Sequence, residues 1–309
     1  MKAAVVSAAG RAAAGCAAAW FSHATLNRVA RDSSSKLIRR TNYRGHQVSM
    51  LGGPAVAVAA LATISLDPHA EPRMRRAAVL AGSAATLAGL LDDLSGTPGA
   101  RGFRGHLGAL RHGKVTTGTG KLGLIGAGGL MAGWCLEPPV SGPDDARESR
   151  RHDFRAIGYR LAAGAVIAAA ANMANLLDLR PGRVLKAVIA AAAPIAASGA
   201  PGYRVAAITG GCAAGMLPLD LSEEVMLGDT GANCVGALLG VASVSGAKPR
   251  TVVGLLSVLA GLTALSERVS FSRVIEANPA LNWVDHLGRR PAEDDPSAQA
   301  EQAGGVGDA

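Results

Sequence analysis

The chain is short of charged and aromatic residues. Only 17% of its 309 residues are Asp, Glu, Lys or Arg and 3% are Phe, Trp or Tyr, whereas 49% are hydrophobic. This composition is too apolar for an ordinary soluble domain. The few cysteines stand alone in or beside apolar stretches without CxxC spacing, which excludes a cysteine-based zinc site and predicts inert thiols. They are Cys16, Cys135, Cys212 and Cys234.

Long runs of Ala, Val, Leu and Gly take the place of the missing charge, and such runs are typical of helices that cross a lipid bilayer. They predict an all-α fold, a polytopic transmembrane bundle of about nine to ten spans. The expected spans are residues 3–22, 51–67, 74–91, 119–137, 156–177, 184–200, 203–219, 231–247 and 250–266. Gly211/Gly215 and Gly236/Gly240 fit the small-xxx-small spacing of close helix contacts, so we interpret them as packing positions.

Residues 1–290 are predicted to form one integral membrane domain, followed by a polar tail at 291–309 with the composition of a disordered segment. Because each span carries the chain across the membrane, segments 27–50, 92–118, 178–183, 220–230 and 267–309 share one side. With the adjoining span ends, this side holds 18 Lys and Arg residues against 12 on the other, and Arg11 lies within a span. The positive-inside rule makes it the cytoplasmic side of a bacterial inner membrane.

The net charge of +8 is therefore interpreted as membrane anchoring, with no nucleic acid as partner. Four polar clusters fall on the predicted cytoplasmic side. They are Asp92-Asp93, Thr116-Thr117 with Lys121, Asn172 to Asp178, and Gly228-Asp229-Thr230-Gly231. One aspartate at a helix end is most simply a cap. Four clusters at one aqueous face instead favour a shared site with a cation, since carboxylates at the edge of a membrane need water, a partner or a metal.

The chemistry of these residues suits a phosphorylated substrate and Mg²⁺. Adjacent carboxylates at Asp92 and Asp93 repel each other unless a cation lies beside them. Mg²⁺ prefers oxygen ligands and is usually held by one or two carboxylates together with substrate phosphates, so Mg²⁺, with Mn²⁺ as the alternative, is the expected cofactor. Lys114 and Lys121 in RHGKVTTGTGKLGL can act as point charges toward phosphate; anchoring of the fourth span at the interface is the alternative role for them.

The order of the motifs resembles that of the polyprenyl-phosphate N-acetylhexosamine-1-phosphate transferases, the family of the phospho-N-acetylmuramoyl-pentapeptide transferase. VSxxGG, LLDD, RGHLxAL…TTGxxK, NxxNLLD and GDTG follow one another between about Asn42 and Gly240. The resemblance implies catalytic roles for Asp92, Asp93, Asp229 and Lys121, and a metal held by Asp93, Asp178 and Asp229. It implies substrate binding by Ser49, Thr116, Thr117, Asn172, Asn175, Asp178 and His286. Val48, Ser49, Gly52 and Gly53 resemble the loop that closes over the nucleotide.

The chain departs from the family in two of these regions. After Asp178 it continues LRPGR, so Leu179 replaces the family's glycine and Pro181 its second aspartate, which affects the motif for uridine recognition. The His-rich loop of the peptidoglycan enzyme is not evident either, and the C-terminal segment offers only Asp285 and His286 in its place. Peptidoglycan precursor synthesis is accordingly not the favoured pathway.

The activity implied by the resemblance is magnesium-dependent transfer of a sugar 1-phosphate from a UDP-sugar to polyprenyl phosphate, which yields polyprenyl-diphosphate sugar and UMP. This reaction would initiate cell-wall or glycopolymer assembly, with membrane lipid as the surroundings and a homodimer as the implied assembly. Two alternatives stay open at this point. One is a catalytically degenerate member that binds polyprenyl phosphate or nucleotide sugar as a sensor or assembly partner. The other is a transporter, which would instead place acids near the middle of its spans.

Overall fold

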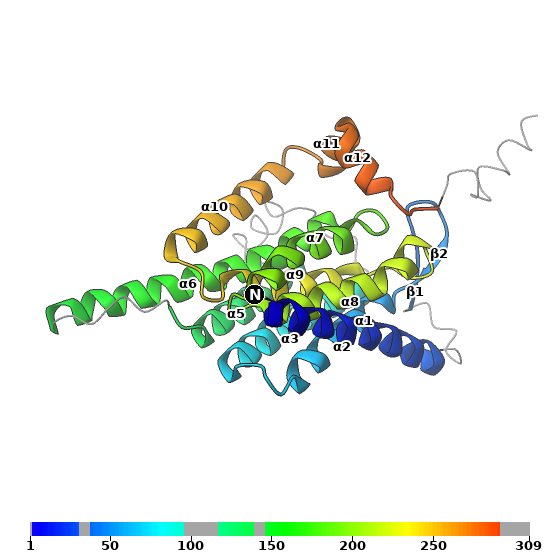
Figure 1. Ribbon diagram of the computed structural model, residues 1–309. Coiled ribbons are helices and arrows are strands. Elements are labelled where there is room, and N and C mark those ends of the chain that lie inside the picture. Colours follow the sequence, from blue (N-terminus) through cyan, green and yellow to red (C-terminus); the bar gives the residue numbers. More distant parts are fainter. Residues whose placement is uncertain (1, 31–37, 96–116, 139–145, 291–309) are drawn as a thin grey trace, which may run out of the picture.

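The computed structural model describes residues 2–30, 38–95, 117–138 and 146–290. In these ranges the chain forms 11 helices and one short hairpin (Figure 1). The helices are α1 (Lys2–Ala30), α2 (Gly52–Leu66), α3 (Pro72–Ser95), α5 (Thr117–Cys135), α6 (Ala146–Leu177), α7 (Arg183–Ser198), α8 (Tyr203–Leu221), α9 (Gly228–Val244), α10 (Pro249–Ser266), α11 (Phe271–Ala277) and α12 (Pro279–His286). The strands β1 (Arg39–Thr41) and β2 (Gln47–Ser49) pair antiparallel, with Arg40 opposite Val48.

Each of the nine expected spans coincides with one helix, from α1 to α10. Within the described ranges, three helical stretches are long and apolar enough to cross a membrane: Pro72–Ser95, Phe154–Leu177 and Pro249–Ser266. Helix α2 is apolar but shorter. The largely helical fold is thus compatible with a membrane protein, and the full number of spans stays a prediction.

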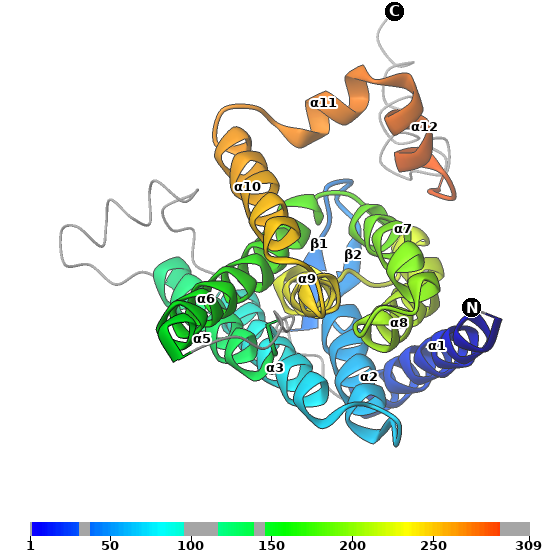
Figure 2. The same cartoon turned by 60° about the vertical axis from the view of Figure 1, so that its left-hand side comes forward.

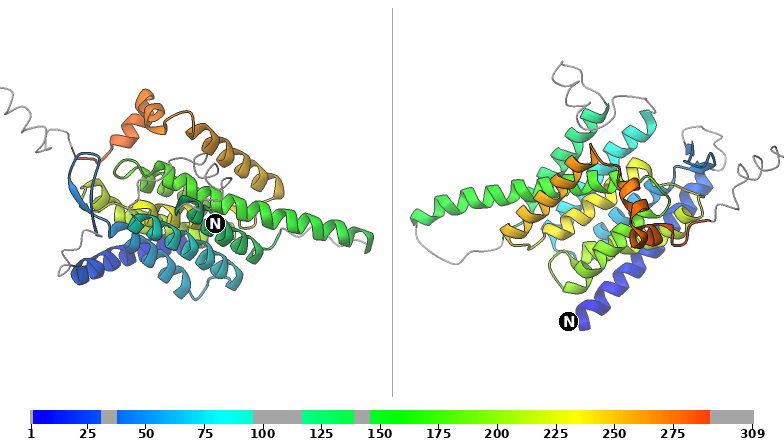
Figure 3. Two further views of the ribbon diagram at one scale, coloured as in Figure 1. Left: turned by 180° about the vertical axis from the view of Figure 1, so that it is seen from behind. Right: turned by 90° about the horizontal axis from the view of Figure 1, so that it is seen from above.

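Some expected boundaries were wrong. Helix α1 continues to Ala30, and α6 begins at Ala146, within a stretch predicted to be a polar connection (Figure 3). Both extensions contain Arg, Ala or Glu, which are good helix formers despite their polarity or small size. The hairpin β1–β2 is a small addition to the predicted all-α fold. The tail at 291–309 lies outside the described residues.

Helix α9 lies at the centre of the bundle, with α2, α3, α6, α7 and α8 packed around it (Figure 2). Nearly all of its residues are buried. Its glycines allow close packing: a Cβ at Gly236 or Gly240 would overlap α6, while one at Gly211 or Gly215 in α8 would overlap α1. The interpretation of these four glycines as packing positions is therefore confirmed.

Two ends of the bundle can be distinguished by their connections. At one end, which we call the aspartate end, the end of α3 meets the start of α9, and Ser49 of β2 pairs with the segment before α9. At the opposite end, Asp67 after α2 lies near Arg204 of α8, and Gly246 after α9 contacts Pro201. This is the grouping of segments that the alternation of spans predicted; the orientation relative to a membrane stays a prediction.

Candidate functional site

Four helices bring polar side chains together at the aspartate end. Asp92 comes from the end of α3, Lys121 from near the start of α5, Asn175 from the last turn of α6 and Asp229 from the start of α9. The ammonium of Lys121 lies among the other three side chains. It forms an ion pair with Asp229 and lies 3.4 Å from Asp92 Oδ2. With the Asn175 amide in the orientation that satisfies its neighbours, the amide oxygen accepts a hydrogen bond from this ammonium at 3.1 Å. The amide nitrogen of Asn175 donates to Asp229 Oδ1 at 2.7 Å.

The members of this cluster differ in their access to solvent. Only 12% of the Lys121 side chain is exposed, against 25% for Asp229 and 34% for Asp92. The cation is thus largely shielded, while the two carboxylate side chains are partly exposed. Charge-assisted contacts in such a partly shielded place are stronger than at an open surface.

Asp93 has a different task from its neighbour. Its carboxylate accepts hydrogen bonds from the backbone N–H groups of Asp229 and Thr230 at 3.2 and 2.9 Å, and from the Thr230 hydroxyl at 2.6 Å. N–H groups at the start of a helix have no acceptor within the helix itself, and this positive end of α9 is where a carboxylate is most stabilising. Asp93 therefore caps a helix other than its own.

A glycine makes this cap geometrically attainable. The Cα of Gly89, one turn before Asp93, lies so close to α9 that an added Cβ would be 2.5 Å from the Thr230 nitrogen. Gly228 at the start of α9 has a φ of +58°, in the left-handed region that favours glycine. A Cβ added to Gly228 would lie 3.0 Å from each oxygen of the Asp93 carboxylate. The GDTG motif is therefore explained in part by the geometry of this helix start.

Asp178 directly follows α6 and is half-buried. Burial raises its pKa well above the ordinary value, and the nearby charges of Asp220 and Asp93 raise it further, whereas a hydrogen bond from the Gly228 N–H opposes the shift. The carboxyl is thus close to the start of α9 but in surroundings that favour its neutral form. A cation beside it would reverse that preference.

The metal ligands predicted from sequence were Asp93, Asp178 and Asp229. Within the described ranges, no group of three or more His, Cys, Asp or Glu side chains lies close enough to hold a metal ion unaided. The oxygens that do converge on one cation are those of Asp92, Asp229 and Asn175, around the Lys121 ammonium. The assignment of ligands to Mg²⁺ stays a prediction.

Ser49 lies at the same end, next to the segment that leads into α9. Its backbone pairs with Glu224 and Met226, while its hydroxyl accepts a hydrogen bond from the Leu51 N–H. Gly52 and Gly53, which follow, allow α2 to pack against this segment, because a Cβ at either position would overlap backbone atoms of Met226 or Leu227. The motif VSxxGG thus positions the start of α9.

The remaining predicted residues are less close to this cluster. The Asn172 amide is 3.4 Å from the Thr263 hydroxyl of α10, and His286 is exposed, with Nδ1 3.0 Å from the Asn282 carbonyl. Thr116 lies outside the described residues, and Thr117 is the first residue of α5. Their predicted roles in substrate binding are not tested by these positions.

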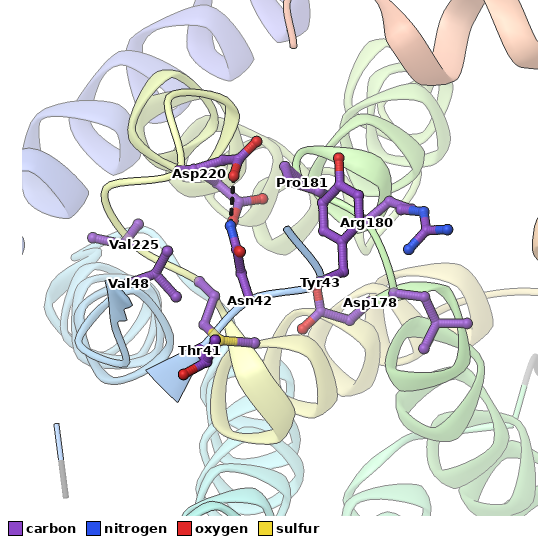
Figure 4. Close-up of a pocket in the computed structure, with 12 residues that line it drawn as sticks. Thr41, Asn42, Tyr43, Val48, Asp178, Arg180, Pro181, Asp220 and Val225 are labelled. Carbon is purple, nitrogen blue, oxygen red and sulfur yellow. Dashed lines mark hydrogen bonds between the residues drawn. The ribbon is translucent and has the colours of Figure 1, made fainter. Parts of the chain in front are cut away.

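Beside the cluster is a pocket that sequence reasoning missed. Its walls come from β1 and the hairpin turn, the stretch Asp178 to Pro181, the end of α8 and the segment before α9 (Figure 4). Within it, the Arg180 guanidinium lies 4.4 Å from the Tyr43 ring centre, and Asn42 donates to Glu223. Leu179, Arg180 and Pro181, which follow Asp178 in sequence, therefore line this pocket. Residues 39–47 are hydrophilic and have no pattern that would predict the hairpin from the sequence.

Asp285, next to the predicted His286, is a structural residue. Its carboxylate accepts two hydrogen bonds from Arg183, at 2.8 and 2.9 Å, and pairs with Arg289 at 2.7 Å. Arg289 also donates to the Pro181 carbonyl at 3.0 Å, so this buried network ties α12 to the pocket wall. Burial tends to raise the pKa of Asp285, but the hydrogen bond from Arg183 and the charges of Arg289 and Arg183 hold it below its ordinary value.

Comparison with known proteins adds no identification, because neither a family model nor a curated protein matches the chain.

Proposed function

We propose that this chain transfers a sugar 1-phosphate from a UDP-sugar to polyprenyl phosphate at the cytoplasmic face of the bacterial inner membrane. The products would be polyprenyl-diphosphate sugar and UMP, and the reaction would begin the assembly of a cell-wall or other glycopolymer. The observation that supports the proposal best is the meeting of Lys121 with Asp92, Asn175 and Asp229, from four motifs that lie far apart in sequence.

In the proposed reaction, an oxygen of the lipid phosphate forms a bond to the β-phosphorus of the UDP-sugar, and the bond from that phosphorus to the bridging oxygen breaks. UMP leaves with the bridging oxygen and its electron pair. The second pKa of a phosphate monoester is about 6, so the attacking phosphate is mostly ionised at neutral pH and needs no strong base. Positioning and charge stabilisation are then the main tasks of the protein.

The surroundings of each residue indicate which of these tasks it performs. Lys121 is the cation that can contact the phosphates, because its ammonium lies beside the partly exposed carboxylates of Asp92 and Asp229. Asp92, which is more exposed than Asp229, is suited to orient the lipid phosphate or to take its last proton. Asp93 holds the start of α9 and thereby positions Asp229.

The donor set fits Mg²⁺, which is commonly held by one or two carboxylates with substrate phosphates. Asp229 and Asp92 would hold it, with Asp178 as the further carboxylate predicted from sequence. Magnesium, when bound, would neutralise part of the negative charge of the diphosphate.

The test is UMP release by the purified chain in detergent with Mg²⁺ and undecaprenyl phosphate, offered UDP-N-acetylglucosamine, UDP-N-acetylgalactosamine or UDP-glucose. We expect release to depend on lipid and to fall by about 10²–10³ in Asp229→Asn, the usual cost of losing one charge-stabilising group. Glu137→Gln is the matched control, because it removes a carboxylate that pairs with Arg73 at the opposite end. Full activity of Asp229→Asn throughout a magnesium titration would refute the assignment.

A second candidate function is binding of the same ligands without turnover. It is favoured by the stretch Leu179 to Pro181, where Arg180 stacks on Tyr43 within the pocket. Saturable binding of undecaprenyl phosphate or a UDP-sugar, with no UMP released from any donor, would establish this candidate in place of the transferase.

A further inference from the structure

A second polar cavity lies at the opposite end of the bundle, away from the cluster around Lys121. It is formed where the α2–α3 connection meets the start of α8. Its apolar walls include the buried side chains of Ile64, Met74, Val205 and Ile208. Its polar lining comprises Asp67, His69, Glu71, Arg75 and Arg204.

The two acids of this cavity are already neutralised by partners. Asp67, which is buried, accepts hydrogen bonds from Arg11 Nε at 2.6 Å and from Arg11 Nη2 at 3.2 Å. Glu71 accepts from the backbone N–H groups of Arg73 and Met74 at 3.0 and 2.9 Å, as a cap at the positive start of α3. Neither carboxylate therefore has its full charge available to repel an anion.

The basic groups, in contrast, have unused donors. Arg204 Nη1 is buried, lies 3.7 Å from Asp67 Oδ2, and has no hydrogen-bond partner in the described part of the chain. The side chains of Arg75, which is half-buried, and His69, which is exposed, also line the cavity and form no hydrogen bond or ion pair with the described residues. Because a buried donor without a partner costs about 1–3 kcal/mol, the buried Nη1 of Arg204 is the group that points to a ligand or water in this cavity.

We infer that this cavity binds a phosphate anion, held by the Arg204 and Arg75 guanidinium groups with His69 at the rim. Guanidinium groups are suited to phosphate because their N–H groups match its oxygens in pairs. The apolar walls beside these donors suit the hydrocarbon part of an anionic phospholipid whose phosphate contacts the arginines, while an inorganic phosphate offers the same oxygens. The inference concerns the end opposite the proposed transferase site and does not depend on that function.

Native mass spectrometry of the detergent-purified full chain can test this, after incubation with phosphatidylglycerol or with phosphatidylcholine of the same acyl chains. We expect one phosphatidylglycerol to be retained in preference to phosphatidylcholine. Arg204→Gln and, separately, Arg75→Gln should each weaken its binding about tenfold, the effect of losing one charged hydrogen bond. Arg250→Gln is the matched control, since it removes an exposed arginine near the start of α10, outside the cavity.

Arg75→Gln keeps the inference testable if Arg204→Gln fails to fold, because Arg75 takes no part in the ion pairs of Asp67. Inorganic phosphate then distinguishes the two sources. If millimolar phosphate displaces the lipid from the wild type, the site recognises the free anion as well; if it does not, the ligand is the lipid headgroup. Equal retention of phosphatidylglycerol by the wild type, Arg75→Gln and Arg204→Gln, or equal loss in Arg250→Gln, would overturn the inference.

Discussion

The contact between α3 and α9 at Gly89 is among the tightest backbone contacts of the candidate site. A methyl group at this position would lie 2.5 Å from the Thr230 nitrogen and still closer to the Asp229 carbonyl, whereas ordinary contact begins at 3.4 Å. Both obstacles are backbone atoms, which cannot rotate away. Gly89→Ala should therefore push the two helices apart by roughly 1 Å, through overpacking of the contact.

The stability cost can be isolated with a second glycine. Overpacking of a tight contact costs about 1–3 kcal/mol, but alanine also favours a helix over glycine by about 0.5–1 kcal/mol. Gly126 in α5 has open space where its Cβ would lie, so Gly126→Ala should show only the helix-propensity gain. Because that gain is common to both variants, their free energies of unfolding should differ by the overpacking cost alone, about 1–3 kcal/mol.

The measurement is unfolding of both variants in the same detergent, followed by UMP release if the proposed transferase activity is found. A displacement of about 1 Å between catalytic groups can cost 10²-fold in rate, so Gly89→Ala should lose about that much activity while Gly126→Ala keeps it. A Gly89→Ala protein as stable and as active as Gly126→Ala would refute the close contact and the positioning argument built on it.

Three further predictions concern the aspartates. Asp93→Ala removes the cap of α9 and should lower the free energy of unfolding by about 1–3 kcal/mol, measured by denaturant unfolding. Asp92→Ala should change stability by less than about 1 kcal/mol but reduce UMP release; the opposite pattern would exchange the two roles. Asp285→Asn leaves Arg183 and Arg289 buried beside each other and should cost about 3–5 kcal/mol. Since the folded-state pKa of Asp285 is lowered, its stabilisation is present above the unfolded pKa of about 3.9 and is lost as the pH falls through the folded pKa. Thermal unfolding from pH 5 downward should thus show a steeper loss in the wild type than in Asp285→Asn, and parallel curves would contradict this.

Much of the helical framework could be predicted because it depends on local composition. The expected span 203–219 became α8 (Tyr203–Leu221), and 250–266 became α10 (Pro249–Ser266), each bounded by Pro, Gly or charged residues. Such boundaries are set by residues near each end, which the sequence displays directly. The alternation of spans then placed the right segments at the aspartate end.

The hairpin and the inner contacts of the site could not be predicted in the same way. Strands β1 and β2 have little apolar alternation, and β2 is held by backbone pairing with Glu224 and Met226, almost 180 residues away in sequence. The C-terminal segment offered Asp285 and His286 as neighbours, and the sequence could not tell the buried acid from the exposed histidine. The two are distinguished by the arginines that pair with Asp285, Arg183 on α7 and Arg289.

The adjacent pair Asp92-Asp93 shows how a repeated residue can serve two purposes. Successive residues of an α-helix point about 100° apart, so the two carboxylates of one helix end cannot both face the same partner. Asp93 faces the start of α9 and uses both oxygens on its N–H groups, and Asp92 faces the ammonium of Lys121. The mutual repulsion expected from sequence is thereby relieved in this structure by two different positive partners, a helix end and a lysine. An approaching phosphate or cation would compete with only one of these partners, the lysine. The helix cap would remain in place while Asp92, Lys121 and Asp229 rearrange around the ligand, which is why we assign the structural role to Asp93 and the chemical one to Asp92.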